Sequence, residues 1–198
     1  MNRIEEKEAY LTLQCLWPKF SNNFYNSESP DLKNDVESIG IEVTQSTLDM
    51  KERIFYLADK MKVKPTEQHR KDLEVMVFYD KDNLYEDYEK SNEHKHTEKE
   101  MVYNTKELIK TKVTKFNNTY SKFNSNGLFM FIRAYKLSER AISEVCRYFA
   151  KVQCNYKTKM DLLFIHNMDE LYVYDLTTLK VNRIEIDDDT KNIIYNVL

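Results

Sequence analysis

The chain is poor in residues that interrupt secondary structure, since its 198 residues include two glycines and three prolines. Gly40 and Gly127 both immediately precede apolar runs typical of strands, which indicates positions where backbone geometry matters. The three cysteines, Cys15, Cys146 and Cys154, are too few and too irregularly spaced for a zinc site or a disulfide framework. Because Cys15 and Cys146 fall on apolar helical positions, we expect buried thiols, as in a reducing cytosol.

A long apolar run and a net positive charge are also missing. No run approaches the roughly 20 apolar residues that span a bilayer. Ile4 is followed at once by four residues that include three acids, so we expect no signal peptide and a cytoplasmic protein. The net charge is −3, with 32% charged residues, so any nucleic-acid surface must be local. The length predicts one domain, residues 1–198, with a sizeable core.

The most informative stretch runs from residue 29 to residue 45. Pro30 and Asp31 precede a polar turn, and residues 39–44 then alternate as in a strand. The alternation puts Glu42 and Thr44 on one face and three β-branched side chains on the other. The return of the chain can bring Asp31 beside Glu42, and two such carboxylates repel each other unless a hard divalent cation lies between them. The alternative is an ordinary hairpin with solvent-facing acids.

Pro30-Asp31 followed by Gly40-Ile41-Glu42-Val43 resembles the motif of the PD-(D/E)-x-K nuclease superfamily, which has the restriction-endonuclease-like fold. The resemblance covers this core motif and, more loosely, the order of elements along most of the chain. It implies that Asp31 and Glu42 bind Mg²⁺ or Mn²⁺, with the carbonyl of Val43 as a further ligand.

The chain departs from this motif at its lysine, because Thr44 stands at that position. Thr44 or Gln45 would then orient the attacking water. A helix is expected over residues 50–62, and Lys51 in its first turn would offset the charge that builds on the phosphate in the transition state. Arg53 is a second candidate for the displaced cation, and the simpler interpretation makes both residues plain surface positions.

A first helix is expected over residues 3–17. Glu5, Glu8 and Thr12 share a narrow polar stripe on this helix. The stripe is either a solvent-facing seam or a set of groups that faces the metal cleft. Nucleases of the resembled superfamily often carry a glutamate of the first helix near the metal, so the resemblance adds Glu8 as a candidate ligand.

Residues 62–104 are predicted to form an insertion or mobile lid, because residues 80–100 are polar, acidic and almost without apolar side chains. His94 and His96 within it have a spacing that could place two metal ligands on one face of a strand. No cysteine or third histidine accompanies them, so a surface loop remains the main interpretation.

Residues 105–123 have the clearest helical pattern, with one apolar stripe and a lysine-rich remainder. Such a face is either simply solvated or binds phosphates. The lysines that would contact nucleic acid are Lys106, Lys110, Lys112 and Lys115.

The remaining chain alternates strand-like and helix-like patterns. Strands are expected at 127–132, 160–165, 171–175 and 181–186, with helices over 139–153 and 189–197. This order predicts an α/β fold, bordering on α+β, with a mixed central sheet flanked by helices. The order is similar to that of the restriction-endonuclease-like core.

Two functions remain open from the sequence. The first is a Mg²⁺- or Mn²⁺-dependent nuclease that hydrolyses DNA phosphodiester bonds. The second is a non-catalytic protein that keeps the nuclease fold and binds nucleic acid or inhibits a partner protein, as a phage or mobile-element protein would. The missing lysine and the net negative charge favour the second. The oligomeric state is open between a monomer and a homodimer.

Overall fold

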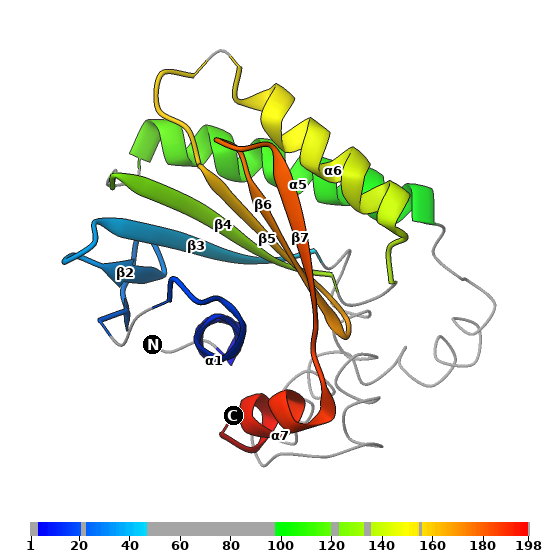
Figure 1. The fold of residues 1–198 in the computed structure, drawn as a ribbon. Coiled ribbons are helices and arrows are strands. Elements are labelled where there is room, and N and C mark those ends of the chain that lie inside the picture. Colours follow the sequence, from blue (N-terminus) through cyan, green and yellow to red (C-terminus); the bar gives the residue numbers. More distant parts are fainter. Residues whose placement is uncertain are drawn as a thin grey trace, which may run out of the picture.

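The computed structural model of the chain describes residues 4–20, 23–46, 98–119, 123–132, 136–154 and 156–197. They form one mixed sheet with helices on both of its faces (Figure 1). The predicted α/β class is therefore confirmed. The predicted helix over 50–62, with Lys51 and Arg53, and the pair His94 and His96 lie outside the described residues.

The sheet has seven strands whose spatial order follows the chain order. Strands β3, β4 and β5 are parallel neighbours, and every other neighbouring pair is antiparallel. Strands β4 and β5 form the buried centre, as their nearly continuous apolar sequences predict. The strands are β1 (Tyr25–Asn26), β2 (Leu32–Asn34), β3 (Ile39–Ser46), β4 (Ser125–Ile132), β5 (Leu162–Asn167), β6 (Glu170–Asp175) and β7 (Lys180–Glu185).

The described helices are α1 (Ile4–Leu16), α5 (Glu98–Thr119), α6 (Glu139–Val152) and α7 (Asp188–Val197). Helices α5 and α6 cover one face of the sheet, and α1 and α7 lie on the other (Figure 1). Helix α5 begins at Glu98, so residues 98–104, which were predicted to be part of the insertion or mobile lid, form its first turns. The remaining residues of the predicted insertion, 62–97, lie outside the described residues, and the insertion stays a prediction. No helix in the described ranges is long and apolar enough to cross a membrane.

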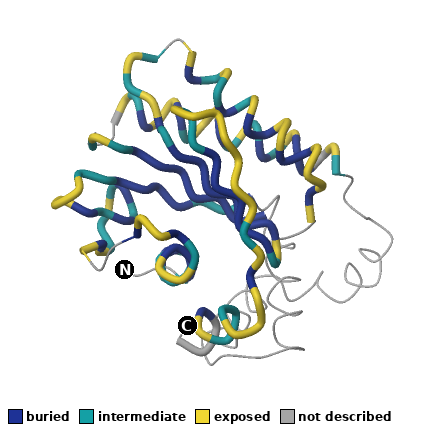
Figure 2. The backbone as a smooth tube through the Cα atoms, viewed as in Figure 1, coloured by how far each residue is buried: buried dark blue, intermediate teal, exposed yellow. Residues whose placement is uncertain are grey.

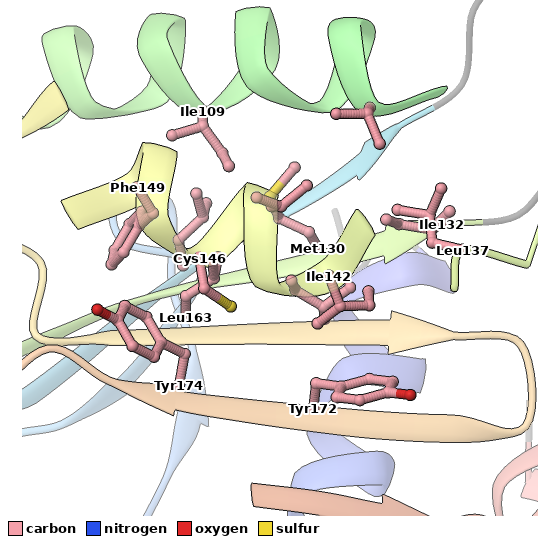
Figure 3. Close-up of a cluster of buried hydrophobic side chains, with 14 of the residues drawn as sticks. Ile109, Met130, Ile132, Leu137, Ile142, Cys146, Phe149, Leu163, Tyr172 and Tyr174 are labelled. Carbon is pink, nitrogen blue, oxygen red and sulfur yellow. The ribbon is translucent and has the colours of Figure 1, made fainter. Parts of the chain in front are cut away.

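Two apolar cores result, one on each face of the sheet. Strands β4, β5 and β6 between them are almost entirely buried, whereas β7 at the sheet edge is largely exposed (Figure 2). In the first core, Ile109 of α5 and Phe149 of α6 pack toward Met130 of the sheet (Figure 3). In the second core, Leu13 of α1 packs with Phe129 of β4. Neighbouring residues of β4 thus serve opposite cores, which explains why β4 has no polar face.

The helix ends largely follow their sequence signals. The hydroxyl of Ser138 accepts a hydrogen bond from the amide of Ala141 at 3.3 Å, as expected for the cap of α6. Helix α7 is capped one residue earlier than its sequence suggests. The carboxylate of Asp187 accepts a hydrogen bond from the amide of Thr190 at 2.7 Å, and Asp188 is already helical.

The two helical cysteines differ in burial. Cys146 is buried in the first core, as predicted, and burial raises the pKa of its thiol to about 12. Cys15 is exposed, so the prediction of a buried thiol is wrong there. Cys15 lies two residues beyond Leu13, which is about 200° around the helix from the side that packs on the sheet.

Candidate active site

The hairpin of β2 and β3 brings Asp31 beside Glu42. Leu32 pairs with Ile41 in the antiparallel ladder, so the preceding residue, Asp31, lies opposite Glu42. A backbone hydrogen bond from the amide of Ser27 to the carbonyl of Asp31, 2.8 Å long, closes the turn before β2. The side chain of Asp31 is held as well, because its Oδ2 accepts a hydrogen bond from the amide of Val43 at 2.7 Å.

The electrostatics of Asp31 are those of a crowded acidic site. Burial, and next the negative charge of Glu42, raise the pKa of Asp31 to about 6. The negative charge of Glu6 adds to the rise, while the amide of Val43 and the charge of Lys112 oppose it. Because the fold holds Asp31 and Glu42 close together, the ionised form of Asp31 is destabilised relative to the protonated form.

A lysine of α5 completes this group of charges. The Nζ atom of Lys112 donates a hydrogen bond to Oε1 of Glu42 at 2.8 Å. The exposed fractions of the two side chains are 19% for Lys112 and 6% for Glu42. The pair is therefore largely shielded from water, where an ion pair interacts more strongly than on the surface. The cation comes from a helix 70 residues further along the chain than Glu42.

The position of Lys112 on α5 explains why it points inward. It lies three residues after Ile109 and four residues before Phe116, and both of these apolar side chains are buried. Residues at these spacings share one side of a helix. Lys112, predicted as a nucleic-acid contact, therefore belongs to the buried side of α5, and this spacing is the sequence signal that could have indicated a place beside the sheet.

The first helix contributes acids to the site, although the one whose charge acts on Asp31 was not predicted. Glu8 and Thr12 are buried, with exposed fractions of 2% and 0%, so the interpretation as a solvent-facing seam is wrong for both. Glu5 is partly buried. The α1 acid that acts on Asp31 is Glu6, also buried. Its spacing of three residues before Ala9, in the second core, was the available signal.

The other predicted catalytic residues are placed differently. Thr44 is partly buried and lies on the same face of β3 as Glu42, two residues away. Gln45 lies on the opposite face by the same alternation, and the structure does not bring it to Glu42. Val43 contributes its amide to Asp31, while its carbonyl as a metal ligand stays a prediction. Lys51 is outside the described residues.

The predicted lysine-rich face of α5 divides into two sides. Lys106 forms an ion pair with Glu144 of α6, and Lys110 lies 3.9 Å from Glu107. Lys112 and the exposed Lys115 point in other directions, because at about 100° per residue Lys112 lies about 120° around the helix from Lys106, and Lys115 about 180°. These lysines therefore do not form one continuous surface.

The carboxylates fit a hard divalent cation. Among the described residues, no group of three or more histidine, cysteine, aspartate or glutamate side chains is close enough together to hold a metal ion. Mg²⁺, however, is commonly bound through one or two carboxylates together with waters and substrate phosphates. Asp31 and Glu42 supply such a pair, and the repulsion that raises the pKa of Asp31 is the kind that a bound cation relieves.

A comparison of the chain with protein families, curated proteins and solved structures finds no match. The resemblance to the PD-(D/E)-x-K superfamily therefore depends on the residues of the motif and on their arrangement.

Proposed function

We propose that this protein is a divalent-metal-dependent nuclease of the PD-(D/E)-x-K type that hydrolyses DNA phosphodiester bonds. Asp31 and Glu42 are the metal ligands, and Lys112 is the cation that replaces the motif lysine absent at Thr44. The observation that supports this most strongly is the 2.8 Å contact of Lys112 with Glu42, in a buried site that also contains Asp31. This contact puts a positive charge beside Glu42, the residue that we assign to the acidic position of the motif.

Each candidate site residue has a distinct role in this proposal. Mg²⁺ or Mn²⁺ bound at Asp31 and Glu42 supplies a Lewis acid for the phosphate and a more acidic water. The amide of Val43 fixes the orientation of the Asp31 carboxylate. Lys112 places an ammonium group beside Glu42, where it offsets negative charge that develops on the phosphate. The hydroxyl of Thr44 orients the attacking water.

Nucleic acid reaches this site on the Lys112 side of α5. Lys115 is exposed and lies three residues beyond Lys112, so it can contact a phosphate next to the scissile one. Lys106 lies about 120° around the helix from Lys112, at the contact with α6. The electrostatic contribution to binding is therefore local, as the net charge of −3 requires.

The experiment is a cleavage assay with labelled DNA and RNA in Mg²⁺ and in Mn²⁺. Asp31→Asn and Glu42→Gln keep the shape of each side chain and remove its charge, so each should lower the cleavage rate about 100-fold or more. Glu37→Gln is the matched control, because Glu37 is an exposed acid of the same hairpin. It should cleave as the wild type does.

A different result would point to the non-catalytic alternative. If the wild type and all three variants are equally inert toward DNA and RNA with both metals, the chain has the fold without the activity. If Asp31→Asn and Glu42→Gln cleave at the wild-type rate, these carboxylates are not the metal ligands.

A further inference from the structure

A second polar contact joins β3 to α5 near the candidate active site. The Oγ atom of Ser46 lies 3.3 Å from Oγ1 of Thr105, and either hydroxyl can be the donor. The exposed fractions of these residues are 3% and 0%. Both hydroxyls are therefore buried where α5 packs on β3, and hydrogen bonds in such surroundings are directional and costly to break.

The spacing of this contact matches that of the Glu42–Lys112 pair. Ser46 follows Glu42 by four residues on the same face of β3, a distance of about 13 Å along a strand. Thr105 precedes Lys112 by seven residues, which is about 10 Å and two turns along the same side of a helix. Helix α5 therefore runs antiparallel to β3 and contacts it through polar groups at two matching points.

The other buried side chains of α5 fix the position of the helix along β3 less strictly than the Ser46–Thr105 contact does. The side chains that face the first core are apolar, among them Met101, Ile109 and Val113. Apolar contacts are non-directional, whereas a buried polar pair specifies one alignment of two elements. A shift of α5 by one residue would move it about 1.5 Å and rotate it about 100°, which would take Lys112 away from Glu42.

We propose that Ser46 and Thr105 are positioning residues, whose contact sets the alignment of α5 on β3 and thereby holds Lys112 on Glu42. The inference deepens the proposed function, because it identifies what keeps the displaced cation in the active site. Its direct consequence, the coupling between Lys112 and Glu42, can be measured without any catalytic activity.

The test is a double-mutant cycle measured in three backgrounds. Glu42→Gln, Lys112→Met and their combination give the coupling between the two charges from urea unfolding. The same cycle is repeated in Thr105→Val, which removes the hydroxyl and keeps the shape. It is repeated again in Ser46→Ala/Thr105→Val, which leaves no hydroxyl unpaired and so guards against simple misfolding. We expect the coupling to fall by about half or more in both backgrounds.

Glu144→Gln provides the control background. It breaks the ion pair that joins α5 to α6 through Lys106 without touching β3, so the coupling should stay at its wild-type value. An undiminished coupling in Thr105→Val and in the double variant overturns the proposal, as does the absence of coupling in the wild type.

Cleavage rates separate this inference from the proposed function. If the wild type is a nuclease, Thr105→Val should lower kcat more than Glu144→Gln does at equal thermal stability, and Thr105→Ser should restore it, because serine returns the hydroxyl. If the wild type is inert, the nuclease proposal fails, while the coupling measurement still decides whether Ser46 and Thr105 position Lys112.

Discussion

At the scale of single residues, the unusual group is Asp31. Its pKa rises from 3.8 to about 6, chiefly through burial and secondly through the charge of Glu42. Between pH 3.8 and about pH 6, the folded protein therefore binds more protons than the unfolded chain. Stability contributed by protonated Asp31 is present below about pH 4 and is lost as the pH rises through about 6. Two pKa units correspond to about 3 kcal/mol, which is an upper limit for this loss.

Asp31→Asn should therefore make the protein more stable at neutral pH. Asparagine is neutral at every pH and can still accept the hydrogen bond from the amide of Val43 through its side-chain oxygen. We expect the free energy of unfolding at pH 7 to exceed that of the wild type by about 1–3 kcal/mol, and the difference to vanish near pH 4. Urea unfolding at the two pH values measures it.

Addition of Mg²⁺ gives the complementary observation. The cation should stabilise the wild type at pH 7 and stabilise Asp31→Asn much less, because a ligand that binds only the folded state raises its stability. An Asp31→Asn protein that is less stable than the wild type at both pH values would show that Asp31 is a structural residue.

At the scale of elements, the β2–β3 hairpin depends on the absence of a side chain at Gly40. Neither glycine of the chain has a positive φ, so conformational freedom is not the reason. A Cβ atom at Gly40 would lie 2.6 Å from Cγ of Pro30 and 2.7 Å from Cδ2 of Phe123. The backbone of Phe123 is itself fixed, because its amide and carbonyl both bond to the side chain of Asn126.

Gly40→Ala should accordingly destabilise the protein by about 1–3 kcal/mol, the usual range for overpacking. The ring of Pro30 is rigid and precedes Asp31, so the same substitution should also lower any cleavage activity. Gly127→Ala is the matched control, since its added Cβ would meet Ile41 and Phe164 at 3.3 Å. Thermal unfolding compares the two, and a Gly40→Ala protein as stable as Gly127→Ala would contradict the account of the hairpin.

The same scale shows which parts of the site a sequence can predict. The alternation of residues 39–44 correctly separated Glu42 from the apolar side chains, because strand geometry is set by neighbouring residues. Strands β3 to β7 and the helices α1 and α6 were predicted close to their observed bounds for the same reason. The start of α5 was missed because its first turns, from Glu98, are polar and resemble the acidic segment before them.

At the scale of the whole molecule, the site depends on contacts between distant segments. Lys112 reaches Glu42 only because α5 packs across β3, and no local pattern states which residue of β3 each turn of a helix will meet. The local hairpin pattern therefore predicted that Asp31 lies beside Glu42, whereas the contact of Lys112 with Glu42 was not predicted. Lys51, which was expected to be the displaced cation, lies outside the described residues. Glu6 was missed in a similar way, because the orientation of α1 on the sheet decides which of its acids acts on Asp31.

The most direct test of the central claim exchanges the position of the lysine. Lys112→Met should lower the cleavage rate about 100-fold or more, whereas Lys99→Met, at an exposed position of the same helix, should leave it unchanged. Thr44→Lys in the Lys112→Met protein restores the lysine at the position where the motif has it, on the same face of β3 as Glu42. We predict that this double variant cleaves at least about tenfold faster than Lys112→Met. A Lys112→Met protein with the wild-type rate, or a double variant no faster than Lys112→Met, would contradict the assignment of Lys112 as the displaced cation.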